Sequence, residues 1–240
     1  MSKPIRIAKV IAQSGKCSRR EAEALILEGR VQVNGVVISS PATFISDESI
    51  KIDGKLLNNR PQAARLFLFY KPVGCICTHQ DPENRTTIFS LLPKNLPRLV
   101  SVGRLDFNTE GLILLTTNGS LARFFELPKN KLIRTYKVRV FGSVDEKKLQ
   151  RLAKGITIEN VRYRPIKAVI DSQSVSNSWL TVHLTEGKNR EIRKIMLHLG
   201  LQVSRLIRVG YGDFNLGEMK PLDIIEVAKR NIPKITSDAI

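Results

Sequence analysis

A polar stretch containing a proline, residues 57–62 (LNNRPQ), interrupts the hydrophobic pattern early in this 240-residue chain. Proline and consecutive asparagines are typical of linkers rather than of helix or strand interiors. We therefore predict a small domain over residues 1–60 and a larger one over 66–228, joined by a linker at 61–65. An aperiodic tail is expected at 229–240.

The small domain has the pattern of two helices followed by a β-hairpin. Apolar residues in segment 7–11 recur at i, i+3 and i+4, the buried stripe of a helix. Residues 18–21 (SRRE) form a capping box that opens a second helix, which should end at Gly29. Residues 31–38 (VQVNGVVI) are two short strands joined by Asn-Gly, the strongest local hairpin signal. The basic, acid-free composition of residues 1–20 leaves an organelle transit peptide open as an alternative.

This helix–helix–hairpin unit resembles the S4 RNA-binding domain over roughly residues 4–60. An S4 domain clamps a folded RNA through its phosphates and supplies affinity rather than chemistry. The resemblance implies phosphate contacts near the turns of the unit, by Arg19, Arg20 and Arg30. An ordinary αα-hairpin without affinity for RNA is the alternative interpretation.

The larger part of the chain mixes strand and helix candidates without the regular order of βαβ units. The strand candidates are residues 66–70, 98–102, 112–116, 136–141 and 179–184. The helix candidates are residues 120–125, 145–153 and 190–199. This mixture predicts an α+β fold in which the larger domain has a largely antiparallel sheet.

The charge of the chain points to a polyanionic partner. Lys and Arg number 39 against 22 Asp and Glu, which gives a formal net charge of +17. A membrane surface is a weaker interpretation, because the sequence has no lipidation motif, no basic amphipathic anchor and no apolar run long enough to span a bilayer. Three cysteines are too few for a disulfide framework, so a reducing, cytoplasmic compartment is expected.

The most informative segment is residues 103–116 (GRLDFNTEGLILLT), where a polar loop lies between two apolar runs. Asp106 lies in this loop with Arg104 two residues before it, and Gly111 allows a tight turn. Asp and Asn in loops often make only Asx turns, which is the plain structural alternative.

Segment 103–116 resembles the signature of RNA pseudouridine synthases, in the branch typified by RsuA and RluB that couples an S4 domain to the catalytic domain. The resemblance covers most of the chain. The family's first, second and tyrosine motifs are matched by residues 70–74 (YKPVG), 104–106 (RLD) and 135–138 (TYKV). The last motif is matched by residues 186–194 (EGKNREIRK), whose Lys-Asn-Arg centre is most like the large-subunit enzymes related to RluB. Thr-Asn-Gly at 117–119 departs from the usual Asn-Asp-Gly and puts only the detail of that turn in doubt.

The resemblance implies isomerisation of a uridine within an RNA chain: the N1–C1′ bond breaks, the uracil turns over, and C5 bonds to C1′. Substrate and product have the same composition, so no cofactor and no metal are expected. The implied partner of a monomeric enzyme is ribosomal RNA or a ribosomal precursor particle, with large-subunit (23S) RNA favoured. The alternatives are small-subunit RNA, transfer RNA, or a non-catalytic RNA-binding factor in ribosome assembly.

The resemblance also assigns roles in the site. Asp106 becomes the catalytic carboxylate, and an adduct at C1′, an adduct at C6 and a glycal route all stay open. A carboxylate shielded from water needs a nearby cation, for which Arg193 is implied, with a phosphate contact as its alternative role. Tyr136 would stack on the target base, or else is simply an inward-facing strand residue, and Ile192 would pack near the base. Arg104 would fill the vacated space or grip a phosphate, or is an ordinary surface arginine.

Other basic residues are expected to face the RNA. Three of them lie in the matched motifs: Lys71, Lys188 and Arg190. Others form a run without acidic residues or follow the last helix, and together they support an RNA face: Lys129, Lys131, Arg134, Lys137, Arg139, Arg205 and Arg208. Most charges of this kind are merely solvated, so the sequence does not indicate which of these residues touch phosphate.

Cys75, Cys77 and His79 alternate along one strand face and are the potential zinc ligands of the sequence. A structural zinc site needs four ligands, and the partner cysteines are missing. The sequence therefore predicts no metal site.

Overall fold

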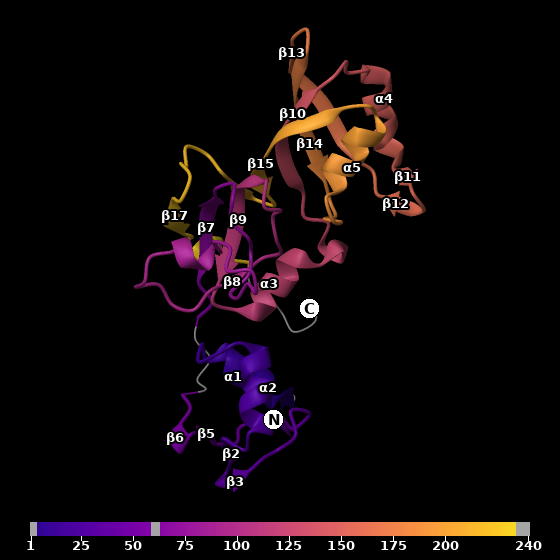
Figure 1. Ribbon diagram of the computed structural model, residues 1–240. Coiled ribbons are helices and arrows are strands. Elements are labelled where there is room, and N and C mark those ends of the chain that lie inside the picture. The colour runs from indigo at the N-terminus through magenta and orange to yellow at the C-terminus, as the bar shows by residue number, and fades with distance from the viewer. Residues whose placement is uncertain (1–3, 59–62, 234–240) are drawn as a thin grey trace. The chain divides into compact units, whose positions relative to one another are not determined.

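The computed structural model describes residues 4–58 and 63–233, which form two compact units (Figure 1). The first unit comprises the residues up to 65, and the short segments 95–100 and 117–119 group with it. The remaining residues from 66 onward form the second unit. The predicted boundaries at 60, 65 and 228 stay predictions, and parts of the predicted linker and tail, at 59–62 and 234–240, lie outside the described residues.

The first unit contains the two helices and the hairpin that the sequence predicts. Helix α1 spans Ile7–Gln13 and α2 spans Arg19–Leu27. The predicted capping box is confirmed, because Ser18 and Glu21 each accept a hydrogen bond from the other's backbone N–H. The strands are β1 (Ile5–Arg6), which pairs with β4 (Phe44–Ile45), and a four-stranded sheet in the order β3 (Val36–Val37), β2 (Val31–Val33), β5 (Ile50–Ile52), β6 (Lys55–Leu56).

The turn positions of this unit also follow the sequence. Gly29 has a φ of +68° just after α2, the left-handed conformation that ends many helices. Asn34 and Gly35 have φ values of +49° and +87°, as expected for the Asn-Gly turn of a hairpin.

The second unit is built on a mixed sheet that is antiparallel except where β9 and β15 pair in parallel. Its strands, in order across the sheet, are β13 (Lys167–Gln173), β14 (Asn177–Leu184), β10 (Arg134–Phe141), β15 (Gln202–Tyr211), β9 (Glu110–Thr116), β7 (Leu66–Lys71) and β17 (Ile224–Glu226), with β16 (Phe214–Asn215) on β15. The short strand β8 (Val100–Ser101) pairs with β9 and completes the sheet. The other elements are the hairpin β11 (Ile156–Ile158) and β12 (Val161–Tyr163), and the helices α3 (Gly119–Glu126), α4 (Glu146–Arg151) and α5 (Glu191–His198). The predicted α+β class with a largely antiparallel sheet is confirmed. None of the helices in the described ranges is long and apolar enough to cross a membrane.

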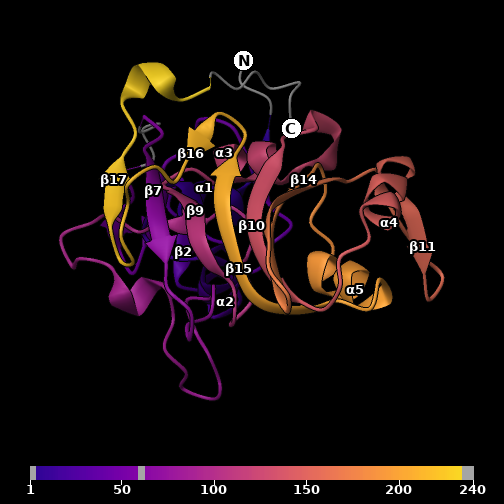
Figure 2. The ribbon, with the colours of Figure 1, turned by 90° about the horizontal axis from the view of Figure 1, so that it is seen from above.

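Four strands of this sheet, β13, β15, β16 and β17, were not predicted. Most residues of β13 are exposed, so this edge strand lacks the apolar alternation of a half-buried strand. Strand β15 lies in the middle of the sheet (Figure 2) but contains Arg205, Arg208 and Gly210, which break the apolar pattern of a central strand. The strand expected at 98–102 is reduced to Val100–Ser101.

One face of the central strands carries the core of this unit. Along β10 the burial alternates, so Arg134, Tyr136 and Val138 are buried on the same face of the sheet. A register shift between Thr135 and Tyr136 places Tyr136 opposite Arg208 on β15. Because opposed residues in a ladder share a face, Arg208 projects on the same side of the sheet as Tyr136.

Candidate active site

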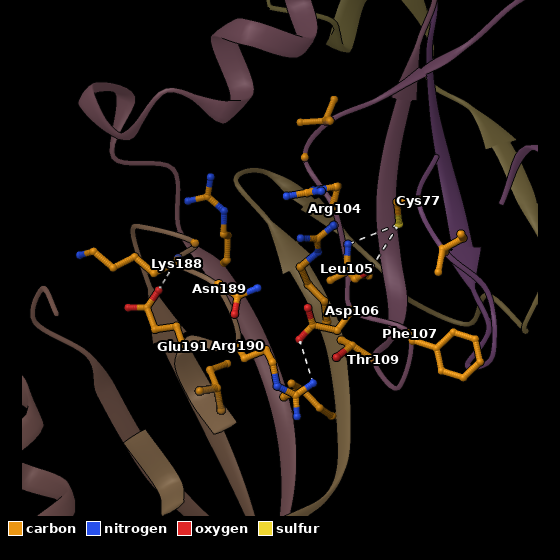
Figure 3. Close-up of a pocket in the computed structure, with 18 of the residues that line it drawn as sticks. Cys77, Arg104, Leu105, Asp106, Phe107, Thr109, Lys188, Asn189, Arg190 and Glu191 are labelled. Atoms are coloured by element: carbon orange, nitrogen blue, oxygen red, sulfur yellow. Dashed lines mark hydrogen bonds and ion pairs between the residues drawn. The ribbon is translucent and has the colours of Figure 1, made fainter. Parts of the chain in front are cut away.

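A cleft of about 720 Å³ opens on this face of the second unit (Figure 3). It is lined by the loop before β9, by the loop that leads into α5, and by inward-facing residues of β10 and β15. All the residues predicted to act on the base line this cleft: Arg104, Asp106, Tyr136 and Ile192. Arg193 does not line it and instead contacts the loop that carries Asp106.

The loop that carries Asp106 is a tight turn held from several directions. The backbone N–H of Thr109 donates to the carbonyl oxygen of Asp106 at 3.0 Å, which closes the turn. The Cys77 thiol lies against the backbone of Leu105, with its sulfur 3.4 Å from the Leu105 nitrogen and 3.5 Å from the carbonyl oxygen (Figure 3). The backbone N–H of Gly74 donates to the Phe107 carbonyl at 3.0 Å. Since the backbone on both sides of Asp106 is held, the direction of its side chain is restricted.

Lys71 fixes the end of the same turn from inside the protein. Its side chain is fully buried, and its ammonium donates to the carbonyl oxygens of Thr109 at 2.8 Å and Pro72 at 2.9 Å. Burial lowers the pKa of Lys71, because a charged group is disfavoured away from water. This placement contradicts the expected RNA contact, since a fully buried ammonium cannot reach a phosphate.

The cation closest to Asp106 is Arg190 rather than Arg193. Nη1 of Arg190 lies 4.0 Å from Oδ2 of Asp106 (Figure 3). Arg190 precedes α5 with a φ of +50°, a left-handed conformation that is costly for a non-glycine residue and that clusters at functional sites. The Asp106 side chain is 32% exposed, so the expected shielding from water is incomplete and depends on what fills the cleft.

Arg193 supports the loop through its backbone. Its guanidinium donates to the carbonyl oxygens of Asn108 at 2.8 Å and Val203 at 3.2 Å, and so ties the Asp106 turn to β15. Burial, together with the neighbouring Arg190, lowers the pKa of Arg193. The implied support of the site by Arg193 therefore takes the form of a bridge between two backbone segments.

The floor of the cleft contains two arginines expected on an exposed RNA face. Arg134 is 7% exposed and Arg208 is 2% exposed. Both guanidinium groups lie over the ring of Tyr211, with the Arg134 carbon 4.8 Å and the Arg208 carbon 5.0 Å from its centroid. Tyr136 is 7% exposed and lines the same floor. These two arginines are therefore not part of an exposed basic face, because cross-strand pairing turns them inward toward the cleft.

Gly111 allows this arrangement at the junction of β9 and β15. Its φ is +102°, and a Cβ at this position would lie 2.3 Å from the carbonyl oxygen of Arg208. Only glycine fits where the two backbones approach this closely in the parallel pair. The tight turn expected at Gly111 is thus a close approach of two strands.

Two buried glutamates lie near the N-terminus of α5: Glu186 in the preceding loop and Glu191 at its first position. Glu186 is 6% exposed and accepts hydrogen bonds from the Lys188 ammonium at 2.6 Å and the Arg164 backbone at 2.8 Å. Glu191 is 4% exposed, lines the cleft, and accepts from the Lys188 backbone at 2.9 Å. Burial, with the nearby Glu186 carboxylate, raises the pKa of Glu191 to about 7. Lys188 is therefore engaged in holding Glu186, and sequence reasoning missed both glutamates because nothing local signals their burial.

The remaining basic residues are placed differently from one another. Arg104 is exposed on the same loop as Asp106 and lines the cleft. Arg19 and Arg20 are both exposed, and Arg19 forms an ion pair with Glu23. Arg30 is paired with two carboxylates of its own domain, at 2.7 Å from Asp53 and 3.0 Å from Glu28. Pairing neutralises much of its charge, so Arg30 is a weaker candidate for a phosphate contact than Arg20.

The candidate zinc ligands have other partners. Cys75 donates to the Pro72 carbonyl, Cys77 lies against Leu105, and the His79 ring stacks on Phe89 with 3.6 Å between centroids. Within the described part of the chain, no group of three or more His, Cys, Asp or Glu side chains is arranged to hold a metal ion.

Comparison with known proteins matches both units. Residues 65–198 match the model of the RNA pseudouridylate synthase family, and residues 5–50 match that of the S4 domain. The chain is 50% identical over 225 residues to an uncharacterized RNA pseudouridine synthase of Rickettsia bellii, covering 94% of this chain and 97% of the relative. It is 42% identical over 224 residues to the ribosomal large subunit pseudouridine synthase B of Yersinia pestis, covering 90% of this chain and 70% of the relative.

A solved structure agrees with the sequence comparisons. A crystal structure of a pseudouridylate synthase superposes with a TM-score of 0.67 at 28% identity, covering 95% of this chain and 98% of the other. The family match covers more than half of the chain, and the cleft of that domain holds the carboxylate, tyrosine and arginines of the family motifs. The chain belongs to the RNA pseudouridine synthases and combines their catalytic domain with an S4 domain.

Proposed function

We propose that this enzyme converts a uridine of large-subunit ribosomal RNA to pseudouridine, with Asp106 as the catalytic carboxylate. The observation that carries the proposal is the position of Asp106. It lies on a backbone turn held by Lys71 and Arg193, its carboxylate is 4.0 Å from Arg190, and it lines the same cleft as Tyr136.

The cleft suits a uridine that has left its helix. A base extruded from RNA must be held by stacking, and stacking on an aromatic ring is worth about 1–3 kcal/mol per base. Tyr136, on the floor, offers that ring, and Ile192 offers an apolar contact beside it. Arg104, exposed on the Asp106 loop, is placed to take the space the base leaves or to bind its phosphate.

Asp106 acts on the nucleotide held there. The N1–C1′ bond breaks, the freed uracil turns over, and C5 bonds to C1′; C5 gives up its hydrogen as a proton and N1 gains one. The Arg190 guanidinium, 4.0 Å from the Asp106 carboxylate, supplies a counter-charge to it while the base displaces water from the cleft. The contacts to the backbone of the loop fix the carboxylate in a reactive position, so that less of the barrier is spent on orientation.

The choice of large-subunit RNA is supported by the relatives named ribosomal large subunit pseudouridine synthase B, at 42–43% identity. The S4 domain and the net charge of +17 support a structured RNA partner. The test is release of tritium from RNA labelled at uridine C5, because C5 loses its hydrogen only when it becomes the glycosidic carbon.

Three labelled RNAs distinguish the possible substrates: 23S RNA, 16S RNA and bulk transfer RNA. Each is tested as naked RNA, and the two ribosomal RNAs are also tested in precursor particles. We expect release from 23S RNA alone. Release from 16S or transfer RNA instead of 23S RNA would contradict the large-subunit assignment, but it would still support pseudouridine synthase activity. Absence of release from all of them would contradict the proposed function.

A further inference from the structure

The floor of the cleft holds positive charge that the protein itself does not neutralise. Within the described residues, neither Arg134 nor Arg208 forms an ion pair with a carboxylate. Both are more than nine-tenths buried. A buried charge without a counter-ion is costly, and proteins seldom keep one without a use.

Arg208 also has an unused donor. Its Nε donates to the carbonyl oxygen of Leu112 at 2.6 Å, whereas its Nη2 is buried and has no hydrogen-bond partner. A buried N–H group without a partner is rare, because it loses its hydrogen bond to water and gains none in return. The side chain is therefore prepared for an acceptor that the protein does not supply.

Tyr211 and Arg134 hold Arg208 in place. The Arg134 guanidinium donates to the Tyr211 hydroxyl at 2.8 Å, and that hydroxyl donates to the Phe125 carbonyl at 2.9 Å. Both guanidinium groups lie within 5.0 Å of the centroid of the Tyr211 ring. The stack is thus rigid, and its charge cannot turn out toward solvent.

The position of Arg208 indicates which acceptor it meets. Arg208 and Tyr136 are opposite each other on neighbouring strands, and both line the cleft. Because Arg208 is the cross-strand neighbour of Tyr136, a base that stacks on Tyr136 brings its edge toward Arg208. A backbone phosphate keeps its water more easily at an exposed cation, and the exposed Arg104, which also lines the cleft, suits it better than the buried Arg208.

We propose that Arg208, held by Tyr211 and Arg134, binds a carbonyl oxygen of the target uracil and stabilises the negative charge that this ring acquires during the reaction. This inference rests on the proposed function. When the N1–C1′ bond breaks, its electron pair passes to the uracil, and the charge is shared with the carbonyl oxygens. In a route through an adduct at C6, the electron pair of the C5–C6 double bond passes instead to the O4 oxygen. A fixed guanidinium at a carbonyl oxygen lowers the barrier in both cases.

The test compares two substrates with one enzyme preparation. The RNA carries either uridine or 5-fluorouridine at the target position, and single-turnover loss of the starting nucleoside is followed in nuclease digests. Fluorine at C5 withdraws electrons and stabilises the anionic ring, so a 5-fluorouridine substrate depends less on Arg208. The ratio of the two rates does not depend on how many enzyme molecules are folded.

For Arg208→Met we expect the rate with uridine to fall by about 100-fold and the rate with 5-fluorouridine to fall by about tenfold or less. The affinity for RNA should stay within about threefold of wild type. Tyr211→Phe should shift the ratio in the same direction by less, and it decides the question if Arg208→Met is too inactive to measure. Arg151→Met, an exposed arginine at the end of α4, should leave the ratio unchanged.

An unchanged ratio in both variants, with an active wild type, would overturn the role of Arg208 and leave the proposed function intact. A loss confined to RNA affinity, with a reduced dependence on salt, would also overturn it and assign Arg208 to a phosphate. A wild-type enzyme that acts on neither RNA would mean that the proposed function itself is wrong.

Discussion

The buried ammonium of Lys71 donates to the carbonyl oxygen of Thr109 at 2.8 Å, three residues after Asp106. This contact joins the end of β7 to the turn that carries the carboxylate, across 38 positions of the chain. A lysine that the sequence suggested for RNA binding thus acts inside the protein as the support of the loop.

Replacing Lys71 by methionine tests this support. Lys71→Met removes the ammonium donor of the Thr109 carbonyl oxygen and leaves the Pro72 carbonyl only its contact with the Cys75 thiol. A buried group left unsatisfied costs about 1–3 kcal/mol. We expect a lower melting temperature and a single-turnover rate reduced by about tenfold or more, with RNA affinity unchanged. Lys147→Met, an exposed lysine of α4, is the control. Loss of RNA affinity with a normal rate would restore the RNA-binding role of Lys71.

Arg193→Lys separates loop support from phosphate binding. Lysine keeps the charge but cannot reproduce the two bonds that the planar guanidinium makes to Asn108 and Val203. We expect the single-turnover rate to fall by about tenfold while the RNA dissociation constant and its salt dependence stay the same. If Arg193 binds a phosphate, substitution by glutamine will reduce the salt slope by about one and leave the rate at saturating RNA unchanged.

The substitution Glu191→Gln is expected to stabilise the fold relative to the wild type, to an extent that depends on pH. Because the folded protein raises the pKa of Glu191 to about 7, the folded state binds this proton more tightly than the unfolded state does. The wild type therefore loses stability relative to Glu191→Gln as the pH rises from about 4.5 to 7, and the difference is constant above that. The shift corresponds to roughly 3–4 kcal/mol.

The measurement for Glu191→Gln is urea denaturation at pH 5 and pH 8. The free energy of unfolding of Glu191→Gln, relative to that of the wild type, should be higher at pH 8 than at pH 5. The substitution of an exposed glutamate, Glu159→Gln, serves as the control. An advantage of Glu191→Gln that is the same at both pH values would show that the proton is not held at this site.

Gly111→Ala tests the close approach of β9 and β15. The added Cβ would lie 2.3 Å from the Arg208 carbonyl oxygen, in a backbone with a φ of +102°. We expect a loss of about 3 kcal/mol or more, or failure to fold, because neither backbone can move without breaking the pair. Gly119→Ala is the matched control, since a Cβ at that position meets no atom within 4 Å. Equal stability of the two variants would contradict the geometry of this junction.

The parts of the structure that follow from the sequence are those with local signals. The capping box at Ser18 and the Asn34-Gly35 turn involve neighbours within a few residues, so their conformations could be predicted. The motif residues Asp106 and Tyr136 were identified by resemblance, and the structure brings them to one cleft. Their roles stay predictions until activity is measured.

The burial of charged side chains could not be predicted in the same way. Arg134 lies against a tyrosine that is 77 positions further along the chain, and Arg205, expected to face RNA, instead pairs at 2.7 Å with Glu110, which is 95 positions away. Nothing local distinguishes such an arginine from a solvated one, because its partners come from other strands. Strand β15 was missed for a related reason, since Arg208 is buried by cross-strand pairing, whereas the more exposed Arg205 pairs with Glu110.

The most direct test of the catalytic role of Asp106 is tritium release from 23S RNA labelled at uridine C5, with the wild type and Asp106→Asn side by side. Asp81→Asn is the matched control, because Asp81 lines the same cleft but is paired with Arg85 at 2.7 Å. We expect release by the wild type and by Asp81→Asn, and a rate for Asp106→Asn reduced by about a thousandfold or more, which is about 4 kcal/mol in the barrier. Release by Asp106→Asn at a rate close to that of the wild type would contradict the catalytic role of this carboxylate.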